Sequence, residues 1–238
     1  MIFARLKDIA PDNKKTWEDK LFLTFDIDWA CDDVLHDTID LVEKAGVAAT
    51  WFVTHDTEVL ERLRRNPLFE LGIHPNFNFL LNGDDRQGKT AKEVVERILN
   101  VVPEAKTVRS HSMTQNSNIL DIFVDLGLTH DSNHFIPEQI NCALAPWHVW
   151  NGLIKAPYFW EDDVVCLYED NTPIIDLKTR PGLKIFDFHP IHVYLNTESL
   201  DRYERTRPIH RDIDALRSHR HDGHGSRSSL RQLTGANE

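Results

Sequence analysis

The sequence predicts an α/β fold, one irregular parallel barrel in which strands alternate with helices. Short apolar runs rich in β-branched and aromatic residues recur between residues 21 and 189, and segments of helical periodicity separate them. Connections of this kind suit right-handed crossovers between parallel strands. The 238 residues, 41% hydrophobic and 27% charged, can form one core, so we expect a single domain over residues 1–238.

The first half of the chain alternates regularly. The run LFLTFDID predicts a buried strand over 21–28, because it is apolar until its acidic end. A helix is expected from Asp32 to Gly46, since apolar side chains fall on one face and glycine commonly ends helices. The same criteria predict a strand over 47–55, a helix over 57–66, a strand over 69–75, a helix over 90–102, a strand over 106–112 and a helix over 116–127.

The alternation becomes less regular after residue 128. Three further strands are expected, over 128–135, 153–160 and 183–189, with longer connections between them. Residues 201–238 contain eight arginines and four of the 13 histidines. We expect this tail to be surface loop with a short helix over 228–233.

Composition excludes several classes of protein. A formal net charge of −11 argues against a general binder of nucleic acids or of anionic membrane surfaces. No stretch approaches the roughly 20 apolar residues of a membrane helix, and the N-terminus lacks the apolar region of a signal peptide. Three widely spaced cysteines without a CxxC pair indicate neither a disulfide framework nor a thiolate zinc site. We therefore expect a cytoplasmic protein, of open oligomeric state.

Chemically capable side chains gather where the predicted strands end. Asp26 and Asp28 end the first strand, His74 ends the third, Arg109 lies in the fourth and His189 ends the last. The carboxyl ends of parallel strands meet at one rim, where α/β proteins bind ligands. The sequence therefore predicts one site at this rim.

The spacing of these residues favours a metal ion. Residues i and i+2 of a strand share a face, so Asp26 and Asp28 should point the same way, as should Arg109 and His111. Two carboxylates on one face repel each other unless a cation or an arginine lies beside them. Aspartate and histidine together suit zinc or a similar divalent metal.

Five segments in chain order, TFDID, GIHPNFN, VRSHS, PYFWEDD and DFHPIH, resemble the motifs of the polysaccharide deacetylase (NodB-like carbohydrate esterase) family. The resemblance covers about residues 21–195 and is strongest to the WbmS-like branch found at O-antigen loci. It implies a distorted (β/α)7 barrel. It also implies a metal-dependent hydrolase that removes N-acetyl groups from an amino sugar of a polysaccharide or its precursor, in surface O-antigen biosynthesis.

The resemblance also implies roles for individual residues. Asp26 matches the catalytic base, Arg109 the arginine that pairs with it, and His189 the general acid. Asp28 and His74 match metal ligands. On the substrate side we expect Trp160 to offer a ring face to a sugar, with Asp162, Asp163 and His192 shaping the rim; Asp187 or an acid of the WEDD segment could orient His189.

Asn78 stands where the family has its second metal-binding histidine, and an amide oxygen is a weaker zinc ligand than imidazole. Three alternatives follow: Asn78 completes the metal site, His111 supplies the missing nitrogen, or the site has lost its metal. We expect one divalent metal, zinc, with an acetylated amino-sugar glycan or precursor as partner.

Less specific interpretations stay open. Asp26 and Asp28 could cap loop amides, and Arg109 could form a structural ion pair. A D-x-D pair after a strand also opens magnesium-dependent phosphohydrolases, although Ala30 stands where that family has Ser or Thr. A metal-free barrel that binds a glycan without turning it over is the non-enzymatic alternative.

Overall fold

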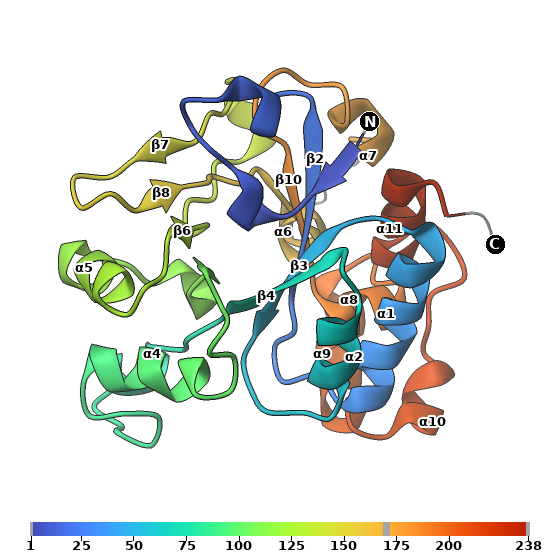
Figure 1. Ribbon diagram of the computed structural model, residues 1–238. Coiled ribbons are helices and arrows are strands. Elements are labelled where there is room, and N and C mark those ends of the chain that lie inside the picture. Colours follow the sequence, from blue (N-terminus) through green and yellow to red (C-terminus); the bar gives the residue numbers. More distant parts are fainter. Residues whose placement is uncertain (1, 169–171, 237–238) are drawn as a thin grey trace.

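One mixed β-sheet runs through the computed structural model, which describes residues 2–168 and 172–236 (Figure 1). Its strands are β1 (Ile2–Ala4), β2 (Lys20–Asp26), β3 (Ala49–Val53), β4 (Phe69–Ile73), β5 (Thr107–Val108), β6 (His130–Asp131), β7 (Trp147–His148), β8 (Ile154–Lys155), β9 (Trp160–Glu161) and β10 (Ile185–Phe188). The order across the sheet is β7-β8-β6-β5-β4-β3-β2-β10-β9, and β1 pairs with β2. The predicted parallel arrangement is confirmed for every pair except β7–β8, which is antiparallel.

The sheet is strongly curled. Strands β5 and β10 lie four steps apart in the strand order, which would separate them by about 19 Å in a flat sheet. Arg109, directly after β5, nevertheless forms an ion pair with Asp187 on β10. The sheet must therefore curve so that both side chains project from its concave face. The predicted irregular α/β barrel is confirmed as a half-barrel, whose strand path among the described residues ends at β7 and β9.

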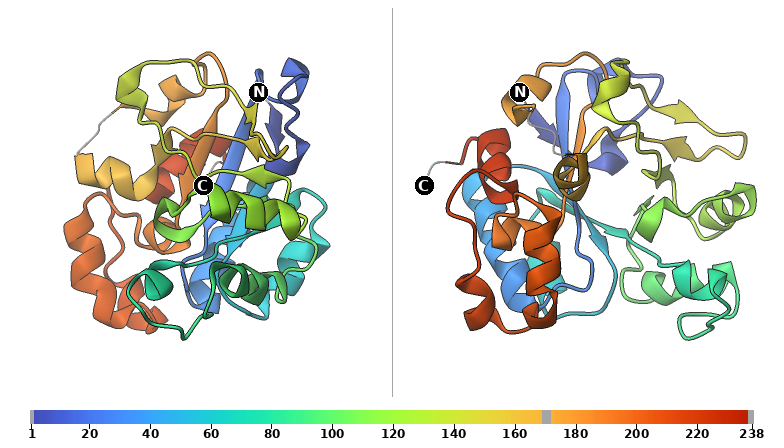
Figure 2. Two further views of the ribbon diagram at one scale, coloured as in Figure 1. Left: turned by 90° about the vertical axis from the view of Figure 1, so that its left-hand side faces the viewer. Right: turned by 180° about the vertical axis from the view of Figure 1, so that it is seen from behind.

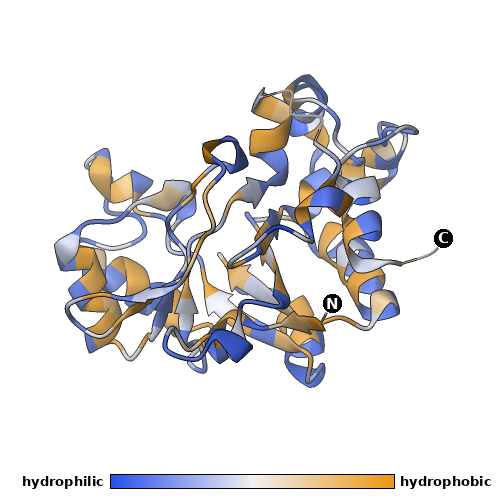
Figure 3. Cartoon of the chain, turned by 90° about the horizontal axis from the view of Figure 1, so that it is seen from above, coloured by the Kyte–Doolittle hydropathy of each residue, from blue (hydrophilic) through white to orange (hydrophobic). Residues whose placement is uncertain are grey.

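Helices cover the outside of this sheet. They are α1 (Asp32–Ala45), α2 (Val59–Arg65), α3 (Asn78–Leu81), α4 (Ala91–Leu99), α5 (Ser117–Asp125), α6 (Asp162–Tyr168), α7 (Ile174–Leu177), α8 (Pro190–Leu195), α9 (Leu200–Thr206), α10 (Ile213–Arg217) and α11 (Ser226–Thr234). Helices α1, α8 and α11 pack together on one side, and α4 packs with α5 on another (Figure 2). Most helices carry both hydrophilic and hydrophobic segments, as amphipathic helices do (Figure 3).

Local signals explain the helix ends. Gly46 takes the left-handed conformation, with φ 64°, and ends α1 as its sequence predicts. The side chain of Thr90 accepts a hydrogen bond from the amide of Glu93 at the start of α4. The side chain of Asn116 does the same for Ile119 at the start of α5. Each cap satisfies an amide that the helix itself leaves unpaired.

Most strands end earlier than predicted, and the single strand expected over 153–160 is two strands, β8 and β9. Two of the early ends concern the site. Strand β2 ends at Asp26, and Asp28 lies in a turn with φ 35°. Strand β5 ends at Val108, and His111 begins the 3-10 turn His111–Met113. The backbone turns away from the sheet at these points, so the expectation that each pair shares a strand face is wrong.

The C-terminal tail is more helical than predicted. The predicted terminal helix is confirmed as α11, but α9 and α10 stand in place of the surface loop, and Leu216 packs in a small second core with Val34 of α1 and Leu195 of α8. Arg227 and Arg220 also form ion pairs with Asp37 of α1. The sequence signal was weak because this core contains few apolar residues. None of the described helices is long and apolar enough to cross a membrane.

Candidate metal and catalytic site

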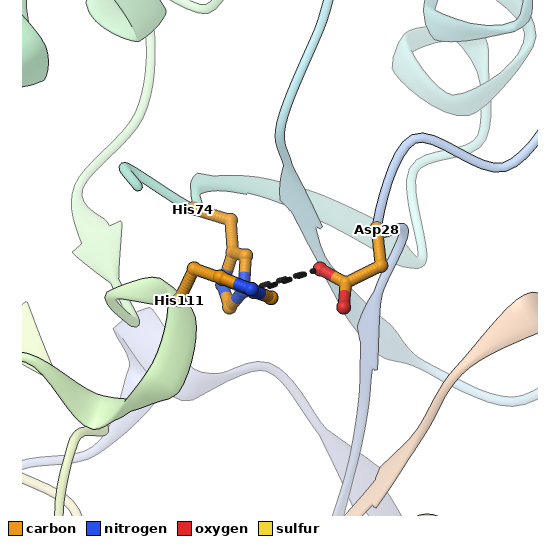
Figure 4. Close-up of side chains that lie close together, drawn as sticks. All are labelled: Asp28, His74 and His111. Carbon is orange, nitrogen blue, oxygen red and sulfur yellow. Dashed lines mark hydrogen bonds and ion pairs between the residues drawn. The ribbon is translucent and has the colours of Figure 1, made fainter. Parts of the chain in front are cut away.

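Three side chains from separate segments converge above the carboxyl ends of the strands (Figure 4). Asp28 follows β2, His74 follows β4 and His111 follows β5. Asp28 Oδ1 lies 3.3 Å from His74 Nε2 and 3.4 Å from His111 Nδ1. The two histidine nitrogens are 3.3 Å apart. The three atoms thus form a nearly equilateral triangle.

This triangle fits a tetrahedral metal ion. Zinc bonds to nitrogen or oxygen of about 2.0–2.1 Å place neighbouring tetrahedral ligands about 3.3 Å apart. Asp28 Oδ1 is buried and has no hydrogen-bond partner of good geometry among the described residues. A buried carboxylate oxygen without such a partner is costly, and a cation would satisfy it. These residues could therefore hold a metal ion.

The charges of this group favour a cation. Burial alone would raise the pKa of Asp28, but its polar contacts with His111 and His74 lower that pKa well below its usual value. Burial would lower the pKa of His74, but Asp26 and Asp28 raise it. The charged form of His74 thus compensates Asp28 here, at the place where a bound cation would do so instead.

Backbone strain accompanies two of these positions. Asp28 and Trp29 have φ of 35° and 55°, and Ser112 and Met113 have φ of 57° and 53°. Left-handed conformations are unfavourable for such residues, and they cluster at functional sites where the surrounding structure enforces them. Each turn therefore orients a potential ligand, Asp28 or His111, and does so at a cost in backbone conformational energy.

Asn78 makes a different contact. It begins α3, and its side-chain amide donates to Ser112 Oγ over 3.0 Å. His111, the alternative third ligand of the sequence prediction, is the residue that completes the triangle. Asn78 instead connects α3 to the turn that carries His111.

Arg109 forms the centre of a second cluster on the concave face. Its side chain is 1% exposed, and Nη1 donates to Asp26 Oδ1 at 3.0 Å and also to Asp187. Its Nε donates to the backbone oxygen of Ser132, and the guanidinium lies over the rings of Phe52 and Tyr158. These contacts fix the orientation of Arg109, and with it Asp26.

The acids around Arg109 outnumber it. Burial raises the pKa of Asp187 to about 7, although Arg109 acts against this. Burial and nearby Asp163 also raise the pKa of Glu161 well above its usual value. Asp26, Glu161, Asp187 and His189 form a second group of potential ligand atoms. The excess of carboxylates makes the concave face receptive to a cation or to protons.

His189 and Asp162 form a buried pair. His189 Nδ1 lies 2.9 Å from Asp162 Oδ1, and the backbone amide of His189 donates to the other carboxylate oxygen. Burial would lower the pKa of His189, but the bond to Asp162 raises it well above its usual value. Burial raises the pKa of Asp162 to about 6. The pair therefore keeps a proton on the histidine, and Nε2 points toward Asp28 Oδ2 at 3.8 Å.

The remaining predicted residues lie around this pair. Asp162, rather than Asp187, is the acid that orients His189. Asp163 is half-buried beside it. His192 is buried and lies between His189 and Tyr203, stacking on the tyrosine ring. Trp160 is 5% exposed and packs on Phe188, so it offers a sugar little open ring face.

Sequence reasoning missed two contributors, Thr24 and Ser132, which both bond to Arg109. Thr24 precedes Asp26 by two residues in a strand, so face-sharing could have found it. Ser132 follows Asp131 as Arg109 follows its register partner Val108, so this contact depends on the pairing of β5 with β6, which the sequence does not specify.

Comparisons with known proteins identify the family to which the chain belongs. The family model described as "WbmS-like: Polysaccharide deacetylase" matches residues 23–207. The chain is similar to a Bordetella bronchiseptica protein, provisionally described as a polysaccharide deacetylase involved in O-antigen biosynthesis. The identity is 48% over 99% of this chain and 98% of that one, with a TM-score of 0.93.

A more distant structure shares the fold. It comes from Mycobacterium smegmatis and is provisionally described as a polysaccharide deacetylase. It is 16% identical, with a TM-score of 0.51 over 78% of this chain and 82% of that one. No curated protein matches the chain.

Proposed function

Because the chain belongs to the WbmS-like polysaccharide deacetylase family, we propose that it is a metal-dependent hydrolase that removes N-acetyl groups from an amino sugar. The observation that carries the proposal is the triangle of Asp28, His74 and His111, with its 3.3–3.4 Å edges. A divalent metal held there would supply Lewis acidity, polarising the acetyl carbonyl and lowering the pKa of water. Zinc suits this aspartate–histidine set best.

The contacts of Asp26 support its proposed role as the general base. Its Oδ1 accepts from Arg109, while Oδ2 lies 3.6 Å from His74 Nδ1, next to the triangle. Arg109 keeps the carboxylate oriented and compensates its charge. In the proposed reaction Asp26 takes a proton from the attacking water as it adds to the acetyl carbon.

The contacts of His189 support its proposed role as the general acid. Asp162 binds Nδ1, which leaves Nε2 directed toward Asp28 and the reacting region. Donation of the Nε2 proton turns the departing nitrogen into a neutral amine, so the C–N bond can break to give acetate and a free amino sugar. The proposed base is thus oriented by Arg109 and the proposed acid by Asp162.

The substrate class follows from the comparison. The similar Bordetella bronchiseptica protein is described as acting in O-antigen biosynthesis. We propose an acetylated amino-sugar glycan, or a precursor of surface O-antigen, as the substrate of this chain. The acidic composition and the reduced cysteines fit a cytoplasmic location, which favours a lipid-linked or nucleotide-linked precursor.

The test is acetate release from N-acetylated amino sugars in free, nucleotide-linked and lipid-linked form, with bound metal measured on the same samples. We expect Asp26→Asn and His189→Ala to keep the metal and lose about 10²-fold or more in turnover. His74→Ala should lose the metal as well. His148→Ala, a substitution at a half-exposed histidine outside the site, is the matched control.

Two results would contradict the proposal. Near-wild-type turnover in both Asp26→Asn and His189→Ala would remove the assigned acid and base. A protein that takes up no metal and releases no acetate, yet binds the glycan, would support the binding-only alternative.

A further inference from the structure

A buried ion pair on β6 and β8 lies on the convex side of the sheet. Val108, Asp131 and Lys155 are register neighbours on β5, β6 and β8, so their side chains project from the same face. Arg109 follows Val108 and projects from the opposite, concave face. Lys155 Nζ lies 2.9 Å from Asp131 Oδ1, and these side chains are 2% and 0% exposed.

Such a pair is expensive to bury, and its value often lies in fixing one arrangement of the chain. Asp131 accepts from the backbone amide of Asn133 at 2.9 Å and from its side-chain amide at 3.0 Å. Lys155 donates to Gln115 Oε1 at 2.6 Å. The ion pair thus orients two residues, Asn133 and Gln115, which hold opposite ends of the loop that precedes α5.

Asn133 and Gln115 hold the two ends of that loop. The backbone amide of Ser110 donates to Asn133 Oδ1 at 2.8 Å. Gln115 closes the other end through Lys155 and, at 3.4 Å, donates to the backbone oxygen of Asn133. His111 lies between these ties, followed by two residues in the left-handed conformation. A turn so strained needs restraints to hold its shape.

We propose that the buried Lys155–Asp131 pair is a positioning device for His111. Acting through Asn133 and Gln115, it holds the 110–115 loop so that His111 Nδ1 stays within ligand distance of Asp28 and His74. None of these four residues belongs to the triangle, so they act on a metal ion only through His111. The inference rests on the proposed function, because it takes His111 as a ligand.

The test is titration of the metal-free protein with Zn²⁺ in competition with a chromophoric chelator. Gln115 is half-buried, and Gln115→Leu removes its hydrogen bonds to Lys155 and Asn133. The substitution leaves the Lys155–Asp131 pair intact. We expect zinc affinity to fall about 10-fold or more, the usual effect of losing a residue that orients a ligand. Gln115→Glu keeps an oxygen for Lys155 and should restore affinity to within about threefold of wild type.

A double-mutant cycle separates positioning from general stability. His111→Ala should weaken zinc binding by itself, and Gln115→Leu should then add no further loss. An equal loss from Gln115→Leu with and without His111, or no loss at all, would overturn the positioning role while leaving the metal site in place. Unchanged zinc affinity in His111→Ala would instead overturn the metal site and this inference together. Thermal unfolding of the metal-free variants checks that each one folds.

Discussion

At the scale of single residues, His192 shows what burial does to one of the 13 histidines. Burial lowers its pKa to about 3, and Nδ1 has no hydrogen-bond partner among the described residues. In the unfolded chain the same group titrates near 6.5. Below that pH the unfolded chain takes up a proton that the folded chain refuses, so folding loses stability.

The predicted pH dependence follows from this sign. Keeping His192 neutral costs the folded chain nothing above pH 6.5. As the pH falls from there toward 3, the free energy of unfolding decreases by at most about 1.4 kcal/mol per pH unit. His192→Phe keeps an aromatic ring on Tyr203 and should flatten the fall in unfolding free energy between pH 6 and 4. Urea unfolding across that range measures it, with His148→Phe as control. Parallel curves for wild type and His192→Phe would contradict the prediction.

At this scale the sequence predicts which residues lie in the site better than it predicts which of them contact one another. Because the carboxyl ends of parallel strands meet at one rim, strand prediction alone places Asp26, Arg109 and His189 in one site. It could not choose between Asp162 and Asp187 as the partner of His189, because both lie near the strand ends. Nor could it choose between Asn78 and His111 as the third metal ligand, since that choice depends on where the turns after the strands begin, to within about one residue.

At the scale of elements, these turns explain the errors in the prediction. Hydrophobic alternation shows where strands lie but not where a non-glycine residue takes a positive φ, as Asp28 and Ser112 do. These residues lie in the turns that follow β2 and β5, and both strands end before the turns begin. The apolar strands of the sheet were predictable, because burial on both faces leaves continuous apolar runs.

The tail helices give an element-scale prediction. Leu216 of α10 is fully buried in the second core, against α1 and α8. Leu216→Ala should reduce the free energy of unfolding by about 2–4 kcal/mol, from lost burial and a cavity. Leu81→Ala, at a leucine 71% exposed, is the matched control and should stay within about 0.5 kcal/mol of wild type. Denaturant unfolding compares them, and equal effects would show that α10 does not dock as described.

At the scale of the whole molecule, the formal net charge of −11 matters less than the positions of the acidic side chains. Asp26, Asp28, Glu161 and Asp187 converge from three strands and a turn onto one concave face, where Arg109 is the buried arginine. The acids come from the adjacent strands β2, β10 and β9 and from the turn after β2, and the curl of the sheet brings Arg109 across to them from β5. A cation that binds only the folded chain therefore should stabilise the whole molecule.

Metal removal tests this coupling. Zinc at 100 times its dissociation constant should raise the unfolding free energy by about 2.7 kcal/mol, and less if the unfolded chain also binds zinc through its many histidines. His74→Ala removes one corner of the triangle and should abolish most of the gain, whereas His148→Ala should keep it. Thermal unfolding with zinc or with a chelator makes the comparison. An equal gain in unfolding free energy for wild type and His74→Ala would mean that the stabilising zinc binds elsewhere, because an ion held by the triangle would bind more weakly without His74.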